Sequence, residues 1–488
     1  MASMEVDNIA KLMKSDVSYN IVLNRASENG EDVKGIMSYE DALNFVRDEL
    51  EKKSKSKKVL NPDDLNGLKD KEMYRKRMQQ YKEEISSIIA LEGIRVAGYE
   101  HEHKPEDRTT EDLIRDIAAD FVGFSVLEEA MEDPGVTDIF VMSYELIYVE
   151  KYGKNEKYQR KFHSKRQYKD FVDRIMRDGG TDLNKGEKKI VDFEVFGNRG
   201  NAIIDTVATK GITLTIRKHS ENPVRLQDII RQNVMSQNIA DFIGTLIEGE
   251  VNLIYGGITG SGKTTTLRAM IDHYVPKLNK RILCLEDTPE LFLKNEHTVE
   301  LKTVHSNKKE ESVTMETLIL TALRMKPKYI VVGEVRGVEA EAAVEGMETG
   351  HSTIFSMHGG TVWNIINRLV TKYLMSMPSL GIEVVERIIG SAVDYVAIQD
   401  DVPGIGRRVT SIHEVSYDFD KRTVKATPII EYSFETGKWD WFSAASAEKT
   451  RTMLRRGVSL DRVKEIQSLD YLKAQEQKCE AAYEASKK

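Results

Sequence analysis

The chain has 488 residues, more than one hydrophobic core usually organises, so two or three domains are expected. Hydrophobic residues make up 40% and charged residues 31%, a balance typical of a globular protein with sizeable cores. The net charge of −8 argues against a protein that coats duplex nucleic acid, and two cysteines exclude a disulfide framework or a four-cysteine zinc site.

Further features of the composition bear on location. The two cysteines, Cys284 and Cys479, fit a reducing cytoplasm. Residues 1–14 lack the apolar centre of a signal peptide, and no stretch approaches ~18 uninterrupted apolar residues. We therefore expect a cytoplasmic protein that does not span a membrane.

Residues 1–107 are expected to form a helical N-terminal region. Ser38 and Asp41 form a capping-box pattern in front of an apolar stripe, and the lysine-rich run 51–58 is expected to be a solvated linker. A second helix is expected over 68–91, with its apolar residues on one face. That face either packs on the protein itself or docks a partner.

Residues 108–218 are expected to form a small α+β domain. Thr109 caps one helix, and a second helix is expected around 171–177. Short apolar runs without a strict βαβ rhythm predict strands at 138–142, 146–150, 203–207 and 212–217. Residues 219–228 follow as a linker.

The pattern changes over residues 229–444. Helical stretches alternate there with strand-length apolar runs at 252–255, 282–285, 329–332 and 353–356. This alternation predicts an α/β domain in which helices cover a parallel sheet. Residues 445–488 are expected to form a charged helical tail.

A glycine-rich segment follows the apolar run 251–255 and precedes a helix-compatible stretch. Residues 257–264 read Gly-Ile-Thr-Gly-Ser-Gly-Lys-Thr, a full match to the P-loop pattern in its required context. The glycines let backbone N–H groups face phosphate oxygens, and the following helix presents its positive end. The predicted nucleotide-binding residues are Gly257, Thr259, Gly260, Ser261, Gly262, Lys263, Thr264 and Thr265.

Lys263, Thr264 and the later Glu334 have distinct predicted roles. Lys263 supplies a positive charge to the β- and γ-phosphates, and the Thr264 hydroxyl is a Mg²⁺ ligand. After the apolar run 329–332, Gly333 stands where an aspartate is usual, and the acid is Glu334. We predict that Glu334 is the base that polarises the attacking water, the alternative being a structural ion pair with Arg336.

Two further clusters follow neighbouring strands. Glu286, Asp287 and Glu290 come after an apolar run and either hold Mg²⁺ through waters or form a solvated loop. His351 and His358 bracket the strand after the Glu334 helix. They predict phosphate sensing or switch coupling, mostly through His358, although structural histidines are the alternative.

These four motifs, in this order, resemble the secretion ATPase superfamily, whose members drive type II secretion, type IV pilus assembly and type IV secretion. The resemblance covers residues 109–434, about two-thirds of the chain. It is nearest the Tad/Flp-pilus branch (CpaF type) at 286–291, at 214–218, at 406–415, and in the strings Ala322-Leu-Arg-Met-Lys-Pro-Lys-Tyr-Ile-Val-Val-Gly-Glu-Val-Arg-Gly337 and Glu348-Thr-Gly-His351.

The resemblance implies a homohexameric ring that hydrolyses ATP with Mg²⁺. Each subunit would carry a PAS-like N-terminal domain and a RecA-like P-loop ATPase domain, with the nucleotide between them. Arg199 and Arg217 match arginines that reach the phosphates from the N-terminal domain, although either residue in a surface ion pair is the alternative. By motif position, the Walker A residues are Lys263 and Thr264, the Walker B acid is Glu334, the Asp box is Glu286, Asp287 and Glu290, and the His box is His351 and His358.

The chain departs from the branch pattern at two places. Phe196-Gly-Asn-Arg199 stands where Asp-Gly-Ser-Arg is usual, and His358-Gly359-Gly360 stands where His-Ala-Asn is usual. A basic stretch at 151–169 is interleaved with aromatic residues. It is interpreted as a solvated hairpin rim, with a membrane-surface, acidic-partner or nucleic-acid contact as alternatives.

The leading hypothesis is a cytoplasmic motor ATPase at the inner face of the membrane. Its partner would be an integral membrane platform protein of a pilus or secretion machine. Conjugative type IV secretion is the main alternative; nucleic acid is not expected as the main substrate, so a translocase ranks lower. A phosphotransferase lacks any acceptor motif, and a scaffold without turnover would not need Lys263, Thr264 and Glu334.

Overall fold

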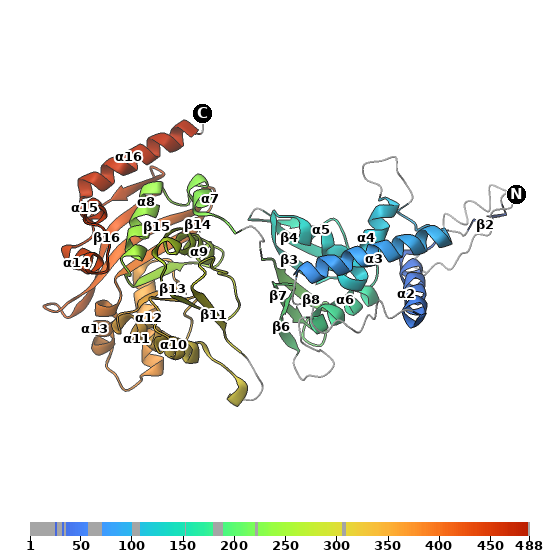
Figure 1. Ribbon diagram of the computed structural model, residues 1–488, viewed down its shortest axis with the longest axis horizontal. Coiled ribbons are helices and arrows are strands. Elements are labelled where there is room, and N and C mark those ends of the chain that lie inside the picture. Colours follow the sequence, from blue (N-terminus) through green and yellow to red (C-terminus); the bar gives the residue numbers. More distant parts are fainter. Residues whose placement is uncertain are drawn as a thin grey trace. The chain divides into compact units, whose positions relative to one another are not determined.

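The computed structural model describes the backbone of residues 25–26, 32–33, 36–56, 71–99, 108–151, 153–178, 189–219, 223–304 and 309–486 (Figure 1). The chain divides into two compact units, Met1–Glu221 and Asn222–Lys488. The division falls inside the expected linker at 219–228, whereas the two sides of the expected boundary at 107–108 belong to one unit. Among the described helices, none has the length and apolar character needed to cross a bilayer.

The first unit combines helices with an antiparallel sheet. A short β1–β2 pair and helices α2, α3 and α4 precede α5, the sheet strands and helix α6. The sheet has the order β5-β4-β3-β8-β7-β6. The bounds are β1 Arg25–Ala26, β2 Asp32–Val33, α2 Tyr39–Ser56, α3 Lys71–Glu92, α4 Thr110–Val122, α5 Glu128–Glu132, β3 Val136–Ser143, β4 Leu146–Lys151, β5 Lys154–Lys157, α6 Lys165–Asp178, β6 Ile190–Val195, β7 Asn198–Ile203 and β8 Thr213–Arg217.

Most of the elements expected in this unit are present. The capping pairs Ser38–Asp41 and Thr109–Asp112 both form, and the apolar faces of α2 and α3 are buried in their own unit. The expected linker at 51–58 was wrong over its described part, because α2 runs to Ser56. The strand expected at 203–207 was also misplaced: β7 ends at Ile203 and a turn follows.

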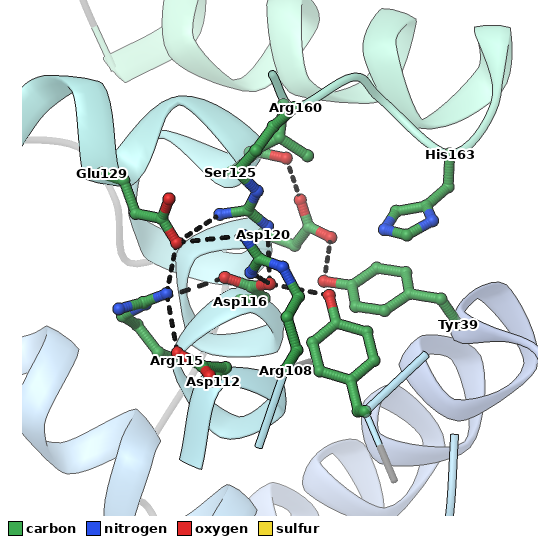
Figure 2. Close-up of polar contacts among 12 residues, drawn as sticks. Tyr39, Arg108, Asp112, Arg115, Asp116, Asp120, Ser125, Glu129, Arg160 and His163 are labelled. Atoms are coloured by element: carbon green, nitrogen blue, oxygen red, sulfur yellow. Dashed lines mark hydrogen bonds and ion pairs between the residues drawn. The ribbon is translucent and has the colours of Figure 1, made fainter. Parts of the chain in front are cut away.

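A network of charged and phenolic groups ties the N-terminal helices to the rest of this unit (Figure 2). The Asp116 carboxylate of α4 accepts hydrogen bonds from Tyr99 at 2.7 Å, Arg108 at 2.7 Å and Arg160 at 2.5 Å. Tyr39, at the start of α2, donates to Asp120 at 2.8 Å. Because Asp116 is 2% exposed, Arg108, Arg160 and the more distant Arg115 must compensate a charge that is withdrawn from water.

The second unit is built on one large sheet with the order β11-β10-β12-β13-β9-β14-β15-β16-β17. Pairing is parallel from β11 to β14 and antiparallel from β14 to β17. The strands are β9 Leu253–Gly257, β10 Ile282–Glu286, β11 Thr298–Lys302, β12 Tyr329–Val332, β13 Ser352–His358, β14 Tyr395–Val402, β15 Gly406–Asp418, β16 Thr423–Ser433 and β17 Lys438–Trp441. The predicted parallel sheet is therefore confirmed, and its antiparallel extension was not predicted.

Helices cover both faces of this sheet. Leu253 and Tyr255 of β9 join one apolar cluster and Ile254 joins the other, so successive side chains face opposite layers. Figure 1 shows α10–α13 grouped together, away from α7–α9. The helices are α7 Leu226–Arg231, α8 Gln237–Glu248, α9 Lys263–Tyr274, α10 Met315–Leu323, α11 Ala340–Glu348, α12 Val362–Ser376, α13 Ile382–Ala392, α14 Ala447–Arg455, α15 Leu460–Gln467 and α16 Leu469–Ser486.

Candidate active site

The glycine-rich segment joins the end of β9 to the start of α9. Gly257, Gly260 and Gly262 have φ values of 155°, 80° and 86°, all in the range that side chains rarely adopt. A Cβ atom on Gly257 would lie 2.0 Å from the Gln399 carbonyl oxygen, so this position has no room for another residue. The loop and the N-terminus of α9 thereby present backbone N–H groups at one edge of the sheet.

The amino group of Lys263 lies at the centre of this loop. Its Nζ donates to the carbonyl oxygens of Gly257 at 3.0 Å and Ile258 at 2.9 Å, and it lies 3.5 Å from His358 Nδ1. Burial lowers the pKa of Lys263 from its ordinary value, opposed by the nearby Glu334 carboxylate. The other predicted binding residues differ in exposure: Ser261 is buried, Thr259 and Gly260 are exposed, and Thr264 and Thr265 are partly exposed in the first turn of α9.

The strand order brings Glu334 to the same edge. Strand β13 lies between β12 and β9, so the ends of β12 and β9 are roughly 10 Å apart, twice the usual strand spacing. His358, the last residue of β13, lies between them and approaches Glu334 with an Nε2–Oε1 distance of 2.8 Å. The pKa of His358 lies below its ordinary value, mainly because the ring is partly buried and next because Lys263 is positively charged. The carboxylate of Glu334 acts in the opposite direction.

Arg336 forms the ion pair that was the alternative interpretation of Glu334. Its guanidinium donates to Glu334 Oε2 at 2.5 Å and lies 3.8 Å from Asp287 Oδ2. The hydrogen bond to Glu334 raises the pKa of Arg336. Glu334 nevertheless keeps its second oxygen towards His358 at the phosphate edge, so the pair with Arg336 holds this carboxylate in place without turning it away.

The carboxylates after β10 occupy different environments. Glu286 is 5% exposed and accepts the backbone N–H groups of Glu290 at 3.0 Å and Leu291 at 3.2 Å, and burial raises its pKa to about 7. Asp287 is more exposed and accepts the Thr303 hydroxyl at 3.1 Å. A Cβ atom on Gly333 would lie 3.0 Å from Glu286 Cγ, so Glu286 fills the space that a side chain there would need.

The Mg²⁺ ion that the motif pattern implies needs few direct protein ligands, because Mg²⁺ usually binds phosphates, waters and one or two carboxylates. Over the described ranges, no three His, Cys, Asp or Glu side chains gather as a metal-binding group. The partly exposed Thr264 and Asp287 fit this limited requirement. Glu286 fits it less well, because backbone N–H groups already engage its carboxylate.

Of the other predicted residues, His351 lies at the opposite end of β13 from His358, and Arg199 and Arg217 belong to the other unit. His351 precedes β13 and contacts Thr349 at 3.0 Å, roughly 20 Å from His358 if the strand rises normally. Arg199 and Arg217 belong to the first unit, where they lie directly opposite each other on β7 and β8. Arg217 Nε donates to Asp138 Oδ1 at 3.0 Å, the ion pair that was its alternative interpretation.

Sequence reasoning missed the residue that supports the loop from the other side. Gln399 of β14 is 1% exposed, accepts the Tyr255 hydroxyl at 2.8 Å and donates to the Ser261 carbonyl oxygen at 2.5 Å. Asp400 accepts the Ile258 N–H at 3.3 Å. The sequence held one signal for this role. Gln399 is the single polar residue in the apolar run 395–399, and a buried amide needs hydrogen-bond partners.

The chain is similar to several known proteins. The sequence profile of the family described as "Type II/IV secretion system protein" matches residues 120–402, more than half of the chain. An uncharacterized protein of Methanocaldococcus jannaschii is 38% identical over 36% of this chain, which spans only 31% of that protein's length. The conjugal transfer protein TrbB of Rhizobium radiobacter is 30% identical over 46% of this chain and 68% of its own.

Among solved structures, the Legionella pneumophila ATPase DotB is 22% identical and covers 70% of this chain and 84% of its own, with a TM-score of 0.44. The ATPases of the matched family are P-loop ATP hydrolases. The matched residues 120–402 contain the P-loop, Glu334 and His358. On this profile match, the chain belongs to the type II/IV secretion system protein family.

Proposed function

We propose that this protein is a motor ATPase that hydrolyses ATP to drive a secretion or pilus-type machine. The observation that carries the proposal is the convergence of Lys263, Glu334 and His358 at one edge of the parallel sheet. A P-loop alone binds phosphate. Glu334 follows β12, which is separated from the P-loop strand β9 only by β13, and its carboxylate adds the base that hydrolysis requires.

The chemistry assigned to these residues follows from their contacts. Lys263 exchanges its two carbonyl partners for the β- and γ-phosphates, whose charge it neutralises. Glu334 accepts a proton from the attacking water, while His358 and Arg336 fix the direction of its two oxygens. Bound Mg²⁺ would supply charge neutralisation on the phosphates, held by Thr264 and, through water, by Asp287.

The finer assignment is also a proposal. We favour assembly, with retraction as a secondary activity, of a Tad-like pilus through an integral membrane platform protein, by a homohexamer at the inner face of the membrane. The strings at 322–337 and 348–351 support the pilus branch, whereas a relative named as a conjugal transfer protein supports conjugative secretion. Arg199 and Arg217 are proposed to act on the phosphates from a PAS-like region within the first unit.

Two substitutions in the full-length protein test the proposed activity. Lys263→Ala should lose ATP binding, and Glu334→Gln should bind ATP but hydrolyse it about 10²–10⁴-fold more slowly, the usual contribution of a positioned base. ATP affinity and phosphate release are measured for each. Glu345→Gln, an exposed glutamate of α11, is the matched control and should keep the wild-type rate. Wild-type turnover in Glu334→Gln would overturn the assignment of the base.

A further inference from the structure

An open cleft of about 580 Å³ lies beside the P-loop on the side of β13. It is lined by Ile258 and Thr259 of the loop, by His358 and Gly359 at the end of β13, and by Asn364, Asn367 and Arg368 of α12. The backbone closes one side of it, because Gly359 N–H donates to the Gly257 carbonyl oxygen at 3.3 Å. The cleft is therefore continuous with the loop that is proposed to hold the terminal phosphates.

The side chains that line the cleft are neutral or positively charged. It carries a guanidinium, two carboxamides, a hydroxyl and an imidazole, and no carboxylate is among the lining residues. The N-terminus of α12, capped by Thr361, lies at the same place and adds its positive end. These groups together suit a compact anion with several acceptor oxygens, and the two carboxylates that touch the lining are engaged, Glu334 by His358 and Asp400 by the Ile258 N–H.

Arg368 differs from Arg336 in its pairing. Arg336 is already paired with Glu334, whereas Arg368 is exposed and has neither a hydrogen bond nor an ion pair to any residue that the structure describes. Its charge reaches the cleft, since it makes a small contribution to lowering the pKa of His358, after burial, Lys263 and Arg336. A planar guanidinium without a protein carboxylate is a ready bidentate partner for phosphate oxygens.

The geometry points to a tetrahedral oxyanion site in this cleft, in which Arg368, Asn364 and Asn367 bind a phosphate group next to the P-loop. The anion is the terminal phosphate of the nucleotide, either still attached or released as orthophosphate. The inference rests on the proposed function, because ATP hydrolysis is the source of this phosphate. Arg368 then has two consequences: it orients the terminal phosphoryl group that water attacks, from which ADP departs as the leaving group, and it delays the departure of the orthophosphate product.

Orthophosphate is the probe that tests the site directly. It is titrated by calorimetry into the full chain, alone and saturated with ADP, for the wild type, Arg368→Gln, Arg368→Lys and Arg387→Gln. Arg387 is an exposed arginine of α13 that does not line the cleft, so its variant is the matched control. With ADP bound, Arg368→Gln should weaken orthophosphate binding by roughly 10- to 100-fold, the range of a charged hydrogen bond, and Arg368→Lys should weaken it less.

A second titration distinguishes the two sources of the anion. If the site binds the attached phosphate, Arg368→Gln lowers affinity for the β,γ-imido analogue of ATP and leaves ADP affinity unchanged. If it binds only the released phosphate, both nucleotide affinities stay at the wild-type value and orthophosphate affinity alone falls. Equal orthophosphate and analogue affinities in Arg368→Gln and Arg387→Gln would overturn the inference.

The same measurements separate this inference from the proposed function. If the wild type hydrolyses ATP but its affinity for phosphate does not depend on Arg368, the proposed function stands and the oxyanion site is refuted. If the protein binds orthophosphate through Arg368 but does not hydrolyse ATP, the oxyanion site stands and the proposed function is refuted. Unfolding followed by tryptophan fluorescence checks that each variant is folded, because Trp363, Trp439 and Trp441 are the three tryptophans of the chain and all lie in the second unit.

Discussion

Glu286 shows how burial changes the chemistry of a single residue. Its carboxyl group lies at the end of β10, where it accepts the N–H groups of Glu290 and Leu291 and lies 3.6 Å from the thiol of Cys284. The backbone N–H groups favour the charged form, but burial outweighs them and raises the pKa to about 7. Near neutral pH this residue therefore exchanges protons, whereas an exposed glutamate would remain ionised.

The pH dependence of stability should report this raised pKa. The folded state holds a proton on Glu286 up to about pH 7, whereas the unfolded chain releases it near 4.5, so stability falls as pH rises between these values. The unfolding free energy of the wild type minus that of Glu286→Gln should fall by about 3 kcal/mol as the pH rises from about 4.5 to about 7. Urea unfolding followed by tryptophan fluorescence measures it, and a pH-independent difference would contradict the assignment.

Residues of the site were predictable where their role depends on neighbours in the chain. Lys263 and Thr264 follow from eight consecutive letters, and Glu334 follows from the apolar strand before it. Gln399 and Arg368 were not predictable, because Gln399 contacts the loop and Arg368 lines the cleft beside it from positions about a hundred or more residues away in the sequence. The sequence pattern placed His351 and His358 at the two sides of one strand, and β13 lies between His351 and the end of the strand at His358.

At the scale of elements, the junction of β13 and α12 explains one departure from the pattern of the family branch. Gly359 stands where alanine is usual, and a Cβ atom there would lie 2.7 Å from Cδ1 of Ile365. Ile365 is fully buried, and the same atom would also lie 2.9 Å from a Cβ atom on Gly256. Ile365 of α12 therefore leaves room only for glycine directly after β13 and at Gly256 on the adjacent strand β9.

A double-mutant cycle tests this packing. Gly359→Ala should destabilise the second unit by roughly 1–3 kcal/mol, because the added methyl group overpacks a full core. Ile365→Val removes the clashing Cδ1 and should cost about 0.5–1.5 kcal/mol alone. The double variant should lose less than the sum, measured by urea unfolding with tryptophan fluorescence. Gly360→Ala is the matched control, since only Asp400 Oδ2 lies within 4.0 Å of its added carbon; strict additivity would contradict the contact.

Elements were predictable from sequence in proportion to their burial. Strands β9, β10 and β12 are buried at every position and appear as continuous apolar runs. Strand β5, at one edge of its sheet, is exposed at every position and reads Lys-Asn-Glu-Lys, so no apolar period marks it. Helix α2 continued beyond its apolar stripe because exposed Glu and Lys residues are good helix formers.

At the scale of the whole molecule, the chain has two units that each contain their own apolar clusters. In the first unit, one cluster joins α2, α3 and α4, and another lies between the sheet and α6. The charged network of Figure 2 spans both clusters, because Asp116 of α4 contacts Arg108 and also Arg160, which follows the sheet hairpin. The N-terminal helices are therefore held by polar as well as apolar contacts.

Removal of the charge on Asp116 should destabilise the first unit specifically. Asp116→Asn keeps the shape of the side chain but leaves Arg108 and Arg160 with only the more exposed carboxylate of Glu129, so the cost should stay below the ~3–5 kcal/mol of a buried charge left without any partner. Hydrogen–deuterium exchange should then accelerate in α2 and α4, while the unfolding midpoint reported by the three tryptophans of the second unit stays unchanged. Asp170→Asn is the matched control: its carboxylate is 58% exposed and 3.9 Å from Arg166, so its loss should change exchange little. If both variants exchange alike, the network does not hold the helices, and the apolar contacts of α2 and α3 alone account for their position.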